Sequence, residues 1–187
     1  MLQNNQILHN TADQANLIIK HLEQNPNVIP VWDLDGVLLN ASHRIKLHAD
    51  GSLDLDQYRL DSTRDNVLKD RCLPLMGVIS HLNTIGRVYH VATARVLCAY
   101  SKELLEQRSI KPAKIISRQG EGDSRKDWIL KVQGVQEQFD PKDFNKIMLI
   151  DDCPSNCDAF VNALGAWAIN VKTDYNSLNN KWLQQLL

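Results

Sequence analysis

The fold is decided by the stretch Val28–Gly36, which reads VIPVWDLDG. Its apolar first half has the length and composition of a buried β-strand. Two carboxylates two residues apart at the end of a strand point the same way, and Gly36 lets the backbone turn away sharply. Alone, an Asp-Gly dipeptide is equally typical of a surface turn. The stretch therefore predicts a strand that ends either in a pair of functional acids or in a plain turn.

Further apolar runs follow at wide spacing, with helix-like stretches between them. Strands are expected at 88–92, 147–150 and 166–171, and a weaker one at 113–116; helices are expected at 73–85, 97–107, 127–138 and 155–164. A first helix is expected at about 11–25, with Thr11 as its cap and Gln14 as the capping-box partner. Strands that alternate with helices predict an α/β fold of three layers, in which helices cover both faces of a parallel sheet. Ligands bind such sheets at the carboxyl ends of the strands.

The composition is that of a water-soluble protein with little general affinity for nucleic acid. The 187-residue chain has a net charge of −1, whereas non-specific binding to nucleic acid depends on an excess of Lys and Arg. We therefore expect no extended nucleic-acid surface, and recognition of an end or a single nucleotide if the substrate is nucleic. There is no run of eighteen apolar residues and no signal-peptide pattern, so we expect a cytoplasmic protein without a membrane partner.

The second apolar run ends in Thr93-Ala94-Arg95. A hydroxyl and a guanidinium at this place could bind phosphate oxygens, the guanidinium through its planar fork. A helix cap is the simpler interpretation of Thr93.

Acids also follow the strand expected at 147–150, where Asp151 and Asp152 stand side by side. Holding two adjacent carboxylates together costs free energy unless a cation or a base neutralises their charge. Between these strands, Asp127 and Lys131 lie four residues apart on an expected helix, which an ordinary surface ion pair would also explain.

In this order, the residues resemble the four motifs of the haloacid dehalogenase (HAD) phosphatases: Asp-x-Asp, then Thr or Ser, then Lys, then Asp-Asp. The resemblance extends from about residue 28 to residue 171. It implies a single HAD-like, Rossmann-type domain over residues 1–187. It also implies a small cap inserted at about residues 45–71, where the sequence is polar.

Three features further resemble the 3′-phosphatase domain of phage-type polynucleotide kinase/phosphatase. They are His43-Arg44 after the first loop, Thr93-Ala94-Arg95, and the segment from Arg118 through Gly122–Asp127 to Lys131. The chain departs from that family at Val37, where Thr is usual, and at Ala94, where Gly is usual. The sequence contains no Gly-x-x-x-x-Gly-Lys-Ser/Thr, so the kinase domain of that family is expected to be absent.

The resemblance implies a role for each residue. Asp33 would be the nucleophile that forms an aspartyl-phosphate, and Asp35 would protonate the leaving oxygen and then activate water. Lys131, positioned by Asp127, and Thr93 would bind phosphate oxygens. The implied substrate clamps are Arg44 and Arg95, with Arg118 as a weaker third. Mg²⁺ would be held by Asp33, the main-chain carbonyl of Asp35, and one or both of Asp151 and Asp152, with Asp152 favoured.

The expected function is therefore that of a Mg²⁺-dependent phosphomonoesterase for a nucleotide or for the 3′-phosphate end of a nucleic acid. Two alternatives stay open. One is a phosphatase for another small phosphorylated metabolite or for a phosphoprotein. The other is a non-catalytic HAD module that binds nucleotides. The sequence leaves the oligomeric state open.

Overall fold

The computed structural model of the chain describes residues 6–50 and 54–173. Six strands form one sheet in the order β1-β8-β7-β2-β5-β6, and every neighbouring pair is parallel. The strands are β1 (Gln6–His9), β2 (Ile29–Trp32), β5 (His90–Val96), β6 (Lys114–Arg118), β7 (Ile147–Asp151) and β8 (Trp167–Lys172). The predicted parallel sheet is thus confirmed. Because β2 lies between β7 and β5, the stretch Val28–Gly36 lies in the middle of the sheet.

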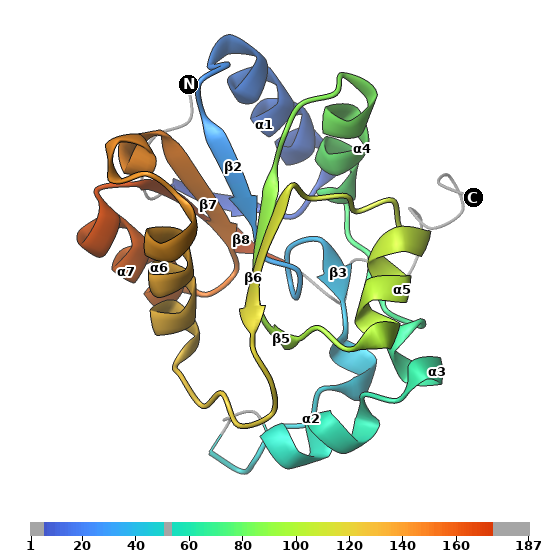
Figure 1. Cartoon of the computed structure of the whole chain (residues 1–187). Helices are drawn as coiled ribbons and strands as arrows, with labels where there is room; N and C mark the ends of the chain where they lie inside the picture. Colours follow the sequence, from blue (N-terminus) through green and yellow to red (C-terminus); the bar gives the residue numbers. More distant parts are fainter. Residues whose placement is uncertain (1–5, 51–53, 174–187) are drawn as a thin grey trace.

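Helices cover both faces of the sheet, as Figure 1 shows. On one side lie α1 (Ala12–Gln24), α4 (Met76–Thr84) and α5 (Ala99–Gln107); on the other lie α6 (Asp127–Gln138) and α7 (Pro154–Leu164). Two buried apolar clusters fill the two interfaces. Trp32 belongs to the first and its neighbour Val31 to the second, and both are fully buried. A strand buried on both faces needs an unbroken apolar run, which explains the composition of β2.

Most predicted boundaries hold within three residues, and the helix at 127–138 agrees with α6 residue for residue. At the start of α1 the Thr11 side chain accepts a hydrogen bond from the backbone N–H of Gln14, as expected. The capping box was wrong in its second half, because Gln14 Oε1 is buried and has no hydrogen-bond partner in the described part of the chain. The side chain of Gln14 therefore does not return to the cap.

Strand β5 differs from the prediction in a way that concerns the site. It was expected to end at Ala92, yet it continues to Val96. Its pairing with β6 is regular up to Ala92 and resumes only at Val96, which pairs with Arg118. An irregularity of this kind redirects side chains. Thr93, Ala94 and Arg95 therefore lie in the irregular end of the strand rather than after it.

Strand β1 and the small antiparallel pair of β3 (Leu39–Asn40) and β4 (Arg71–Cys72) were not predicted from the sequence. Between β3 and β4 lie the short 3₁₀ helix η1 (Ser42–Arg44) and the helices α2 (Leu55–Asp61) and α3 (Arg64–Val67). The helices α2 and α3 lie in the segment expected to form a cap, of which residues 51–53 lie outside the described residues. Figure 1 shows α2 beyond the carboxyl ends of β5 and β6.

A second 3₁₀ helix, η2 (Pro141–Lys146), leads into β7. Within residues 6–50 and 54–173, no helix has the length and apolar character needed to cross a membrane.

Candidate active site

Adjacent strands β2 and β7 bring two acids to one buried lysine. Asp33 follows β2 and Asp151 is the last residue of β7. Lys131 Nζ lies 2.6 Å from Asp151 Oδ2 and 3.3 Å from Asp33 Oδ2, and this lysine is fully buried. It also lies 3.3 Å from Asp127 Oδ2, one turn earlier on α6. The surface ion pair that seemed possible for Asp127 and Lys131 is therefore part of a buried cluster of charges.

Charge in this cluster is only partly balanced within the protein. Burial and the negative charges of Asp151, Asp127 and Asp152 raise the pKa of Asp33, although Lys131 opposes the shift. Burial alone would lower the pKa of Lys131, but the surrounding carboxylates raise it well above its ordinary value. The lysine is therefore charged at neutral pH.

Asn156, on α7, is a member of the cluster that the sequence analysis missed. Its Nδ2 donates to Asp127 Oδ2 at 2.8 Å and to Asp151 Oδ1 at 3.0 Å, and its side chain is buried. Asp151 Oδ1 also accepts from the backbone N–H of Cys153 at 2.8 Å. Both oxygens of Asp151 are thus engaged by protein donors. The only sequence signal for Asn156 was its place in the first turn of the helix after the paired acids.

Three carboxylates of the cluster are placed to hold a metal ion. Asp33, Asp151 and Asp152 each offer an oxygen, and these atoms lie within 4.8 Å of one another. Burial, followed by the charge of Asp151, raises the pKa of Asp152 to about 7. A set of oxygen donors with excess negative charge fits a hard divalent cation such as Mg²⁺. The residues present therefore fit the ion that the sequence predicts.

Gly36 lets Asp152 approach the loop after β2. Its φ is +76°, a left-handed conformation that side chains other than glycine rarely adopt. A Cβ atom at this position would lie 2.0 Å from Asp152 Oδ2, far inside van der Waals contact. The Gly of the Asp-Leu-Asp-Gly string is therefore required by the backbone angle and by the neighbouring carboxylate.

Hydrogen bonds from two residues far apart in the sequence, Asn10 and Thr173, hold the same loop in place. Asn10 Nδ2 donates to the carbonyl oxygen of Val37 at 2.9 Å, and its Oδ1 accepts from the N–H of Leu75 at 3.0 Å. The Thr173 hydroxyl donates to the carbonyl oxygen of Gly36 at 2.5 Å, and Asn10 makes a longer contact of 3.4 Å to the same oxygen. Val37, the departure from the family pattern, is fully buried and belongs to the core.

A second charged cluster lies beside the first and contains the predicted arginine clamps. Arg95 binds Asp35 with two hydrogen bonds, from Nε at 2.7 Å and from Nη2 at 2.6 Å. Burial would raise the pKa of Asp35, but the charge and hydrogen bonds of Arg95 lower it below its ordinary value. Asp70, which the sequence analysis missed, accepts from both Arg44 and Arg95. Arg44, Arg95 and Asp70 are all buried.

Thr93 and Arg118 have partners of their own in the chain. The buried Thr93 hydroxyl accepts from the backbone N–H of Arg95 at 3.3 Å and so steadies the irregular end of β5. Arg118 Nη1 donates to the carbonyl oxygens of Asp123 and Arg125, both at 2.7 Å. It therefore braces the loop between β6 and α6. The side chain of Asp123 binds Arg125, whose hydrogen bonds lower the pKa of the Asp123 carboxyl.

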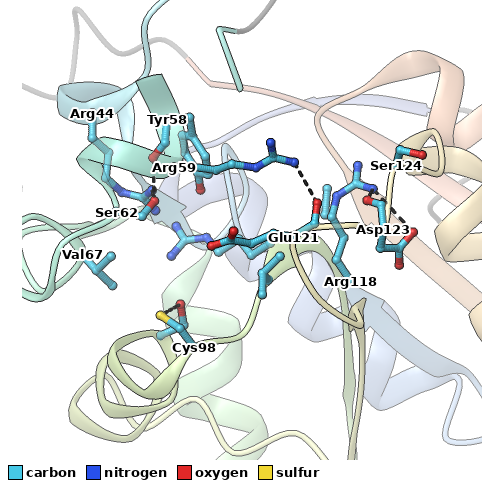
Figure 2. Close-up of a pocket in the computed structure, with 14 residues that line it drawn as sticks. Arg44, Tyr58, Arg59, Ser62, Val67, Cys98, Arg118, Glu121, Asp123 and Ser124 are labelled. Carbon is cyan, nitrogen blue, oxygen red and sulfur yellow. Dashed lines mark hydrogen bonds and ion pairs between the residues drawn. The ribbon is translucent and has the colours of Figure 1, made fainter. Parts of the chain in front are cut away.

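A pocket of about 200 Å³ opens between the inserted segment and the ends of β5 and β6. Figure 2 shows Arg44, Tyr58 and Arg59 on one side of it and Arg118 and Asp123 on the other. Arg59 Nη2 spans the two sides by donating to the carbonyl oxygen of Glu121 at 3.0 Å. Arg95 also lines the pocket, whereas Asp33 does not. Arg95 thus lines the pocket and also pairs with Asp35, which stands two residues after Asp33 of the buried charge cluster.

The arrangement agrees with known folds. A hydrolase of the HAD-like family from Streptococcus pneumoniae has a TM-score of 0.58 and 12% identity, over 83% of this chain and 91% of that one. A putative phosphatase from Clostridium difficile has a TM-score of 0.57 and 16% identity, over 76% and 83%. A chain of the Pnkp1/Rnl/Hen1 complex has a TM-score of 0.56 and 18% identity, over 80% and 47%. The predicted HAD-like fold is confirmed.

Sequence comparison points to a more specific group. The 5′-deoxynucleotidase of Escherichia phage T5 is 27% identical over 100 residues, which are 51% of this chain and 38% of that protein. The match thus spans well under half of the relative. The family model described as bacteriophage T5 5′-deoxynucleotidase matches residues 21–127, which include Asp33, Asp35 and the predicted arginine clamps. Because this match covers more than half of the 187 residues, the chain belongs to the bacteriophage T5 5′-deoxynucleotidase family.

Proposed function

We propose that this protein is a Mg²⁺-dependent phosphomonoesterase that acts on nucleotides through an aspartyl-phosphate on Asp33. The observation that carries the proposal is the convergence of Asp33, Asp151 and Asp152 around the buried Lys131 at the carboxyl ends of β2 and β7. Carboxylates beside a fixed cation form a site for an anionic phosphoryl group and a metal ion. The name of the phage T5 relative, 5′-deoxynucleotidase, supports a nucleotide as substrate.

In the proposed first step, a carboxylate oxygen of Asp33 attacks the phosphorus atom and the bond to the leaving oxygen breaks. The leaving oxygen takes a proton from Asp35. In the second step Asp35 removes a proton from water, which attacks the phosphorus and releases inorganic phosphate and free Asp33. Since Arg95 holds Asp35 ionised in the structure, Asp35 must take up a proton from solvent before it can act as the acid, and the turn of Arg95 to the substrate phosphate would favour this uptake.

The remaining residues bind and orient the phosphate. Lys131 and Thr93 would bind its oxygens, with Asp127 positioning the lysine 3.3 Å away. Mg²⁺ would be held by Asp33, Asp152 and the main-chain carbonyl of Asp35, and would supply the charge that neutralises both nucleophile and phosphate. Asp152 is favoured over Asp151 as the direct ligand, because both oxygens of Asp151 already accept hydrogen bonds from protein donors.

The inserted segment would act as the cap of a single domain. Its helices α2 and α3 contribute Tyr58, Arg59 and Val67 to the wall of the pocket beside Arg95. A cap in this place would exclude water and select the group that leaves with the phosphate. Arg44 from η1 and Arg95 from β5, which share Asp70, would clamp the substrate together, and Arg118 would do so from the end of β6.

A 3′-phosphate end of a nucleic acid is a second candidate substrate. It is favoured by the three arginines Arg44, Arg95 and Arg118, which line one pocket. This is the set that the resemblance to polynucleotide 3′-phosphatases implies.

Phosphate release by purified protein tests the proposal. The substrates should be deoxynucleoside and ribonucleoside monophosphates, 3′-phosphorylated oligonucleotides, sugar phosphates and a phosphopeptide, each with Mg²⁺ or with EDTA. We expect release from a nucleotide substrate with Mg²⁺ and none with Asp33→Asn. Asp140→Asn is the matched control and should keep full activity, because Asp140 is the exposed residue at the start of η2, outside the site.

Other outcomes would point elsewhere. Activity confined to sugar phosphates or to the phosphopeptide would favour a different phosphatase. Tight nucleotide binding without turnover would favour a non-catalytic module. Equal activity of the wild type and Asp33→Asn would refute the proposed nucleophile.

A further inference from the structure

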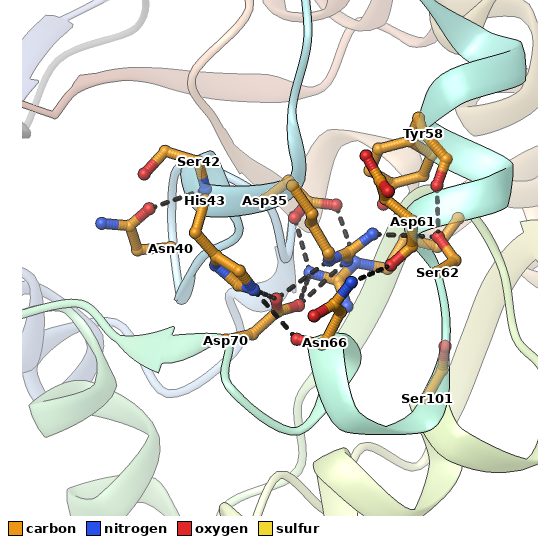
Figure 3. Close-up of polar contacts among 12 residues, drawn as sticks. Asp35, Asn40, Ser42, His43, Tyr58, Asp61, Ser62, Asn66, Asp70 and Ser101 are labelled. Atoms are coloured by element: carbon orange, nitrogen blue, oxygen red, sulfur yellow. Dashed lines mark hydrogen bonds and ion pairs between the residues drawn. The ribbon is translucent and has the colours of Figure 1, made fainter.

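Asp70 joins the two arginines that line the pocket. It stands at the end of the inserted segment, immediately before β4, and is fully buried. Arg44 donates to it from Nε at 3.0 Å and from Nη2 at 2.9 Å, and Arg95 donates from Nη2 at 2.7 Å. Figure 3 shows Asp70 below Asp35, with Tyr58 and Ser62 of the insert on the other side of the contacts. A single carboxylate therefore contacts both guanidinium groups.

Two arginines cannot share a buried site without a negative charge between them. Arg44 is 3% exposed and Arg95 is 5% exposed, so water does little to screen their repulsion. Buried charges are stable only when they are paired and hydrogen-bonded. Asp35 contacts Arg95, but among the carboxylates of residues 6–50 and 54–173 Asp70 alone is hydrogen-bonded to both. Asp70 therefore sets the position of the two guanidinium groups relative to each other.

The two arginines depend on Asp70 to different degrees. Arg44 has further partners, since its Nη1 donates to the Ser62 hydroxyl at 3.1 Å and its guanidinium lies 4.5 Å from the centre of the Tyr58 ring. Arg95 has Asp35 as its other anionic partner. If Arg95 turns from Asp35 to a substrate phosphate, as proposed above, Asp70 is the acid that keeps it in place during the exchange.

We propose that Asp70 is a positioning residue that holds Arg44 and Arg95 together as one clamp for the substrate phosphate. The inference rests on the proposed function, and it adds a residue that does not itself touch the substrate. This role also explains the contact between Asp70, at the end of the insert, and Arg95 in β5. The clamp is assembled from three parts of the chain, and Asp70 is the part that both arginines share.

The Asp70→Asn variant tests the role, because it keeps the shape but replaces an acceptor oxygen with a donor that faces two arginines. We expect the KM for the preferred nucleotide to rise about tenfold, as for the loss of a charge-assisted hydrogen bond, while kcat changes by less than about threefold. The dissociation constant of inorganic phosphate, measured by calorimetry, should rise by a similar factor. Asp61→Asn, in the same insert, is the control: its carboxylate pairs at 3.5 Å with exposed Lys46 rather than with the two arginines, so the variant should leave both constants unchanged.

A double-mutant cycle separates positioning from simple structural support. If Asp70 acts through Arg95, the double variant Asp70→Asn/Arg95→Ala should be within about twofold of Arg95→Ala alone. An unchanged KM and phosphate affinity in Asp70→Asn would overturn the proposal. So would a double variant in which the two losses simply multiply.

A second comparison covers the case in which Asp70→Asn does not fold. Arg44→Met/Asp70→Asn removes one positive and one negative charge together, which buried pairs tolerate better than the loss of one partner. Its phosphate affinity should be about tenfold weaker than that of Arg44→Met, and equal affinities would overturn the proposal. Because phosphate binding is measured without turnover, an inactive wild type would refute the proposed function and still leave the role of Asp70 decided.

Discussion

Replacing Lys131 with methionine should lower the free energy of unfolding by about 3–5 kcal/mol, the cost of removing one partner from a buried ion pair. Lys131 Nζ lies 2.6 Å from Asp151 and 3.3 Å from both Asp33 and Asp127, and the side chain is fully buried. Methionine nearly keeps the volume of the side chain, so the loss reports the charge rather than a cavity. Proteins of this size have a total stability of about 5–15 kcal/mol, so the effect would be large.

The sign of the effect follows from the pKa of Lys131. Although burial alone would lower this pKa, Asp33, Asp151 and Asp127 raise it above the ordinary value of 10.5. A group whose pKa is raised on folding contributes its full stability below the unfolded pKa and loses it only as the pH rises through the folded value. The stabilisation by Lys131 is therefore fully present at pH 7.5, where the variant can be compared directly with the wild type.

Urea unfolding followed by circular dichroism, at pH 7.5 with EDTA, provides the measurement. With a slope of about 2 kcal/mol per molar, the midpoint should fall by about 1.5–2.5 M while the slope stays constant. Lys146→Met is the control, because Lys146 is 47% exposed and its pair with Asp143 should contribute at most about 1 kcal/mol. A loss in Lys131→Met no larger than in this control would refute the view that the lysine holds the carboxylates together.

Gly36→Ala should cost about 1–2 kcal/mol in urea unfolding for the left-handed backbone alone, and should weaken Mg²⁺ binding in calorimetry because the new methyl group meets Asp152. Mg²⁺ should raise the thermal unfolding midpoint of the wild type, EDTA should reverse the rise, and Asp152→Asn should remove most of it. Acidification from pH 7 to pH 5 should reduce the contribution of two histidines to the free energy of unfolding, while the raised pKa values of Asp33 and Asp152 act in the opposite direction. Burial lowers the pKa values of His21 and His90, so the unfolded chain binds more protons below about pH 6.5. His90→Leu removes one of these contributions, so the free energy of unfolding of the variant relative to the wild type should rise as the pH falls from 7 to 5, and a constant difference in urea titrations would contradict the assignment.

The sheet and the acidic cluster could be predicted because each depends on a local pattern. An apolar run as short as Val28–Trp32 forms a strand, and a parallel sheet brings the carboxyl ends of its strands to one edge. For that reason Asp33, after β2, and Asp151, at the end of β7, lie beside the same lysine. The helix bearing Asp127 and Lys131 was placed correctly because its apolar residues repeat with helical spacing over twelve residues.

The second cluster could not be predicted in the same way, because its partners are set by tertiary contacts. Asp70 is one acid in a polar segment without periodicity, and it meets Arg44 and Arg95 at sequence separations of 26 and 25 residues. The sequence indicated Arg95 by its place after an apolar run and Arg44 through family resemblance, but no pattern in it predicts that both are buried against an acid. Strand β1 was missed because four residues at the edge of a sheet carry little pattern, and its pairing with β8 is formed by residues far along the chain.

The hydrogen bonds of Asn10 and Thr173 have a practical consequence for anyone who shortens or tags this protein. These two residues are separated by 163 positions, yet both bind the carbonyl oxygen of Gly36 and each other. A deletion that reaches either residue would release the loop that carries Asp35, while every charged side chain of the two clusters would remain in the chain. Loss of activity after trimming at either end would then be a mechanical effect on this loop, and restoring the asparagine or the threonine would be the first repair to attempt.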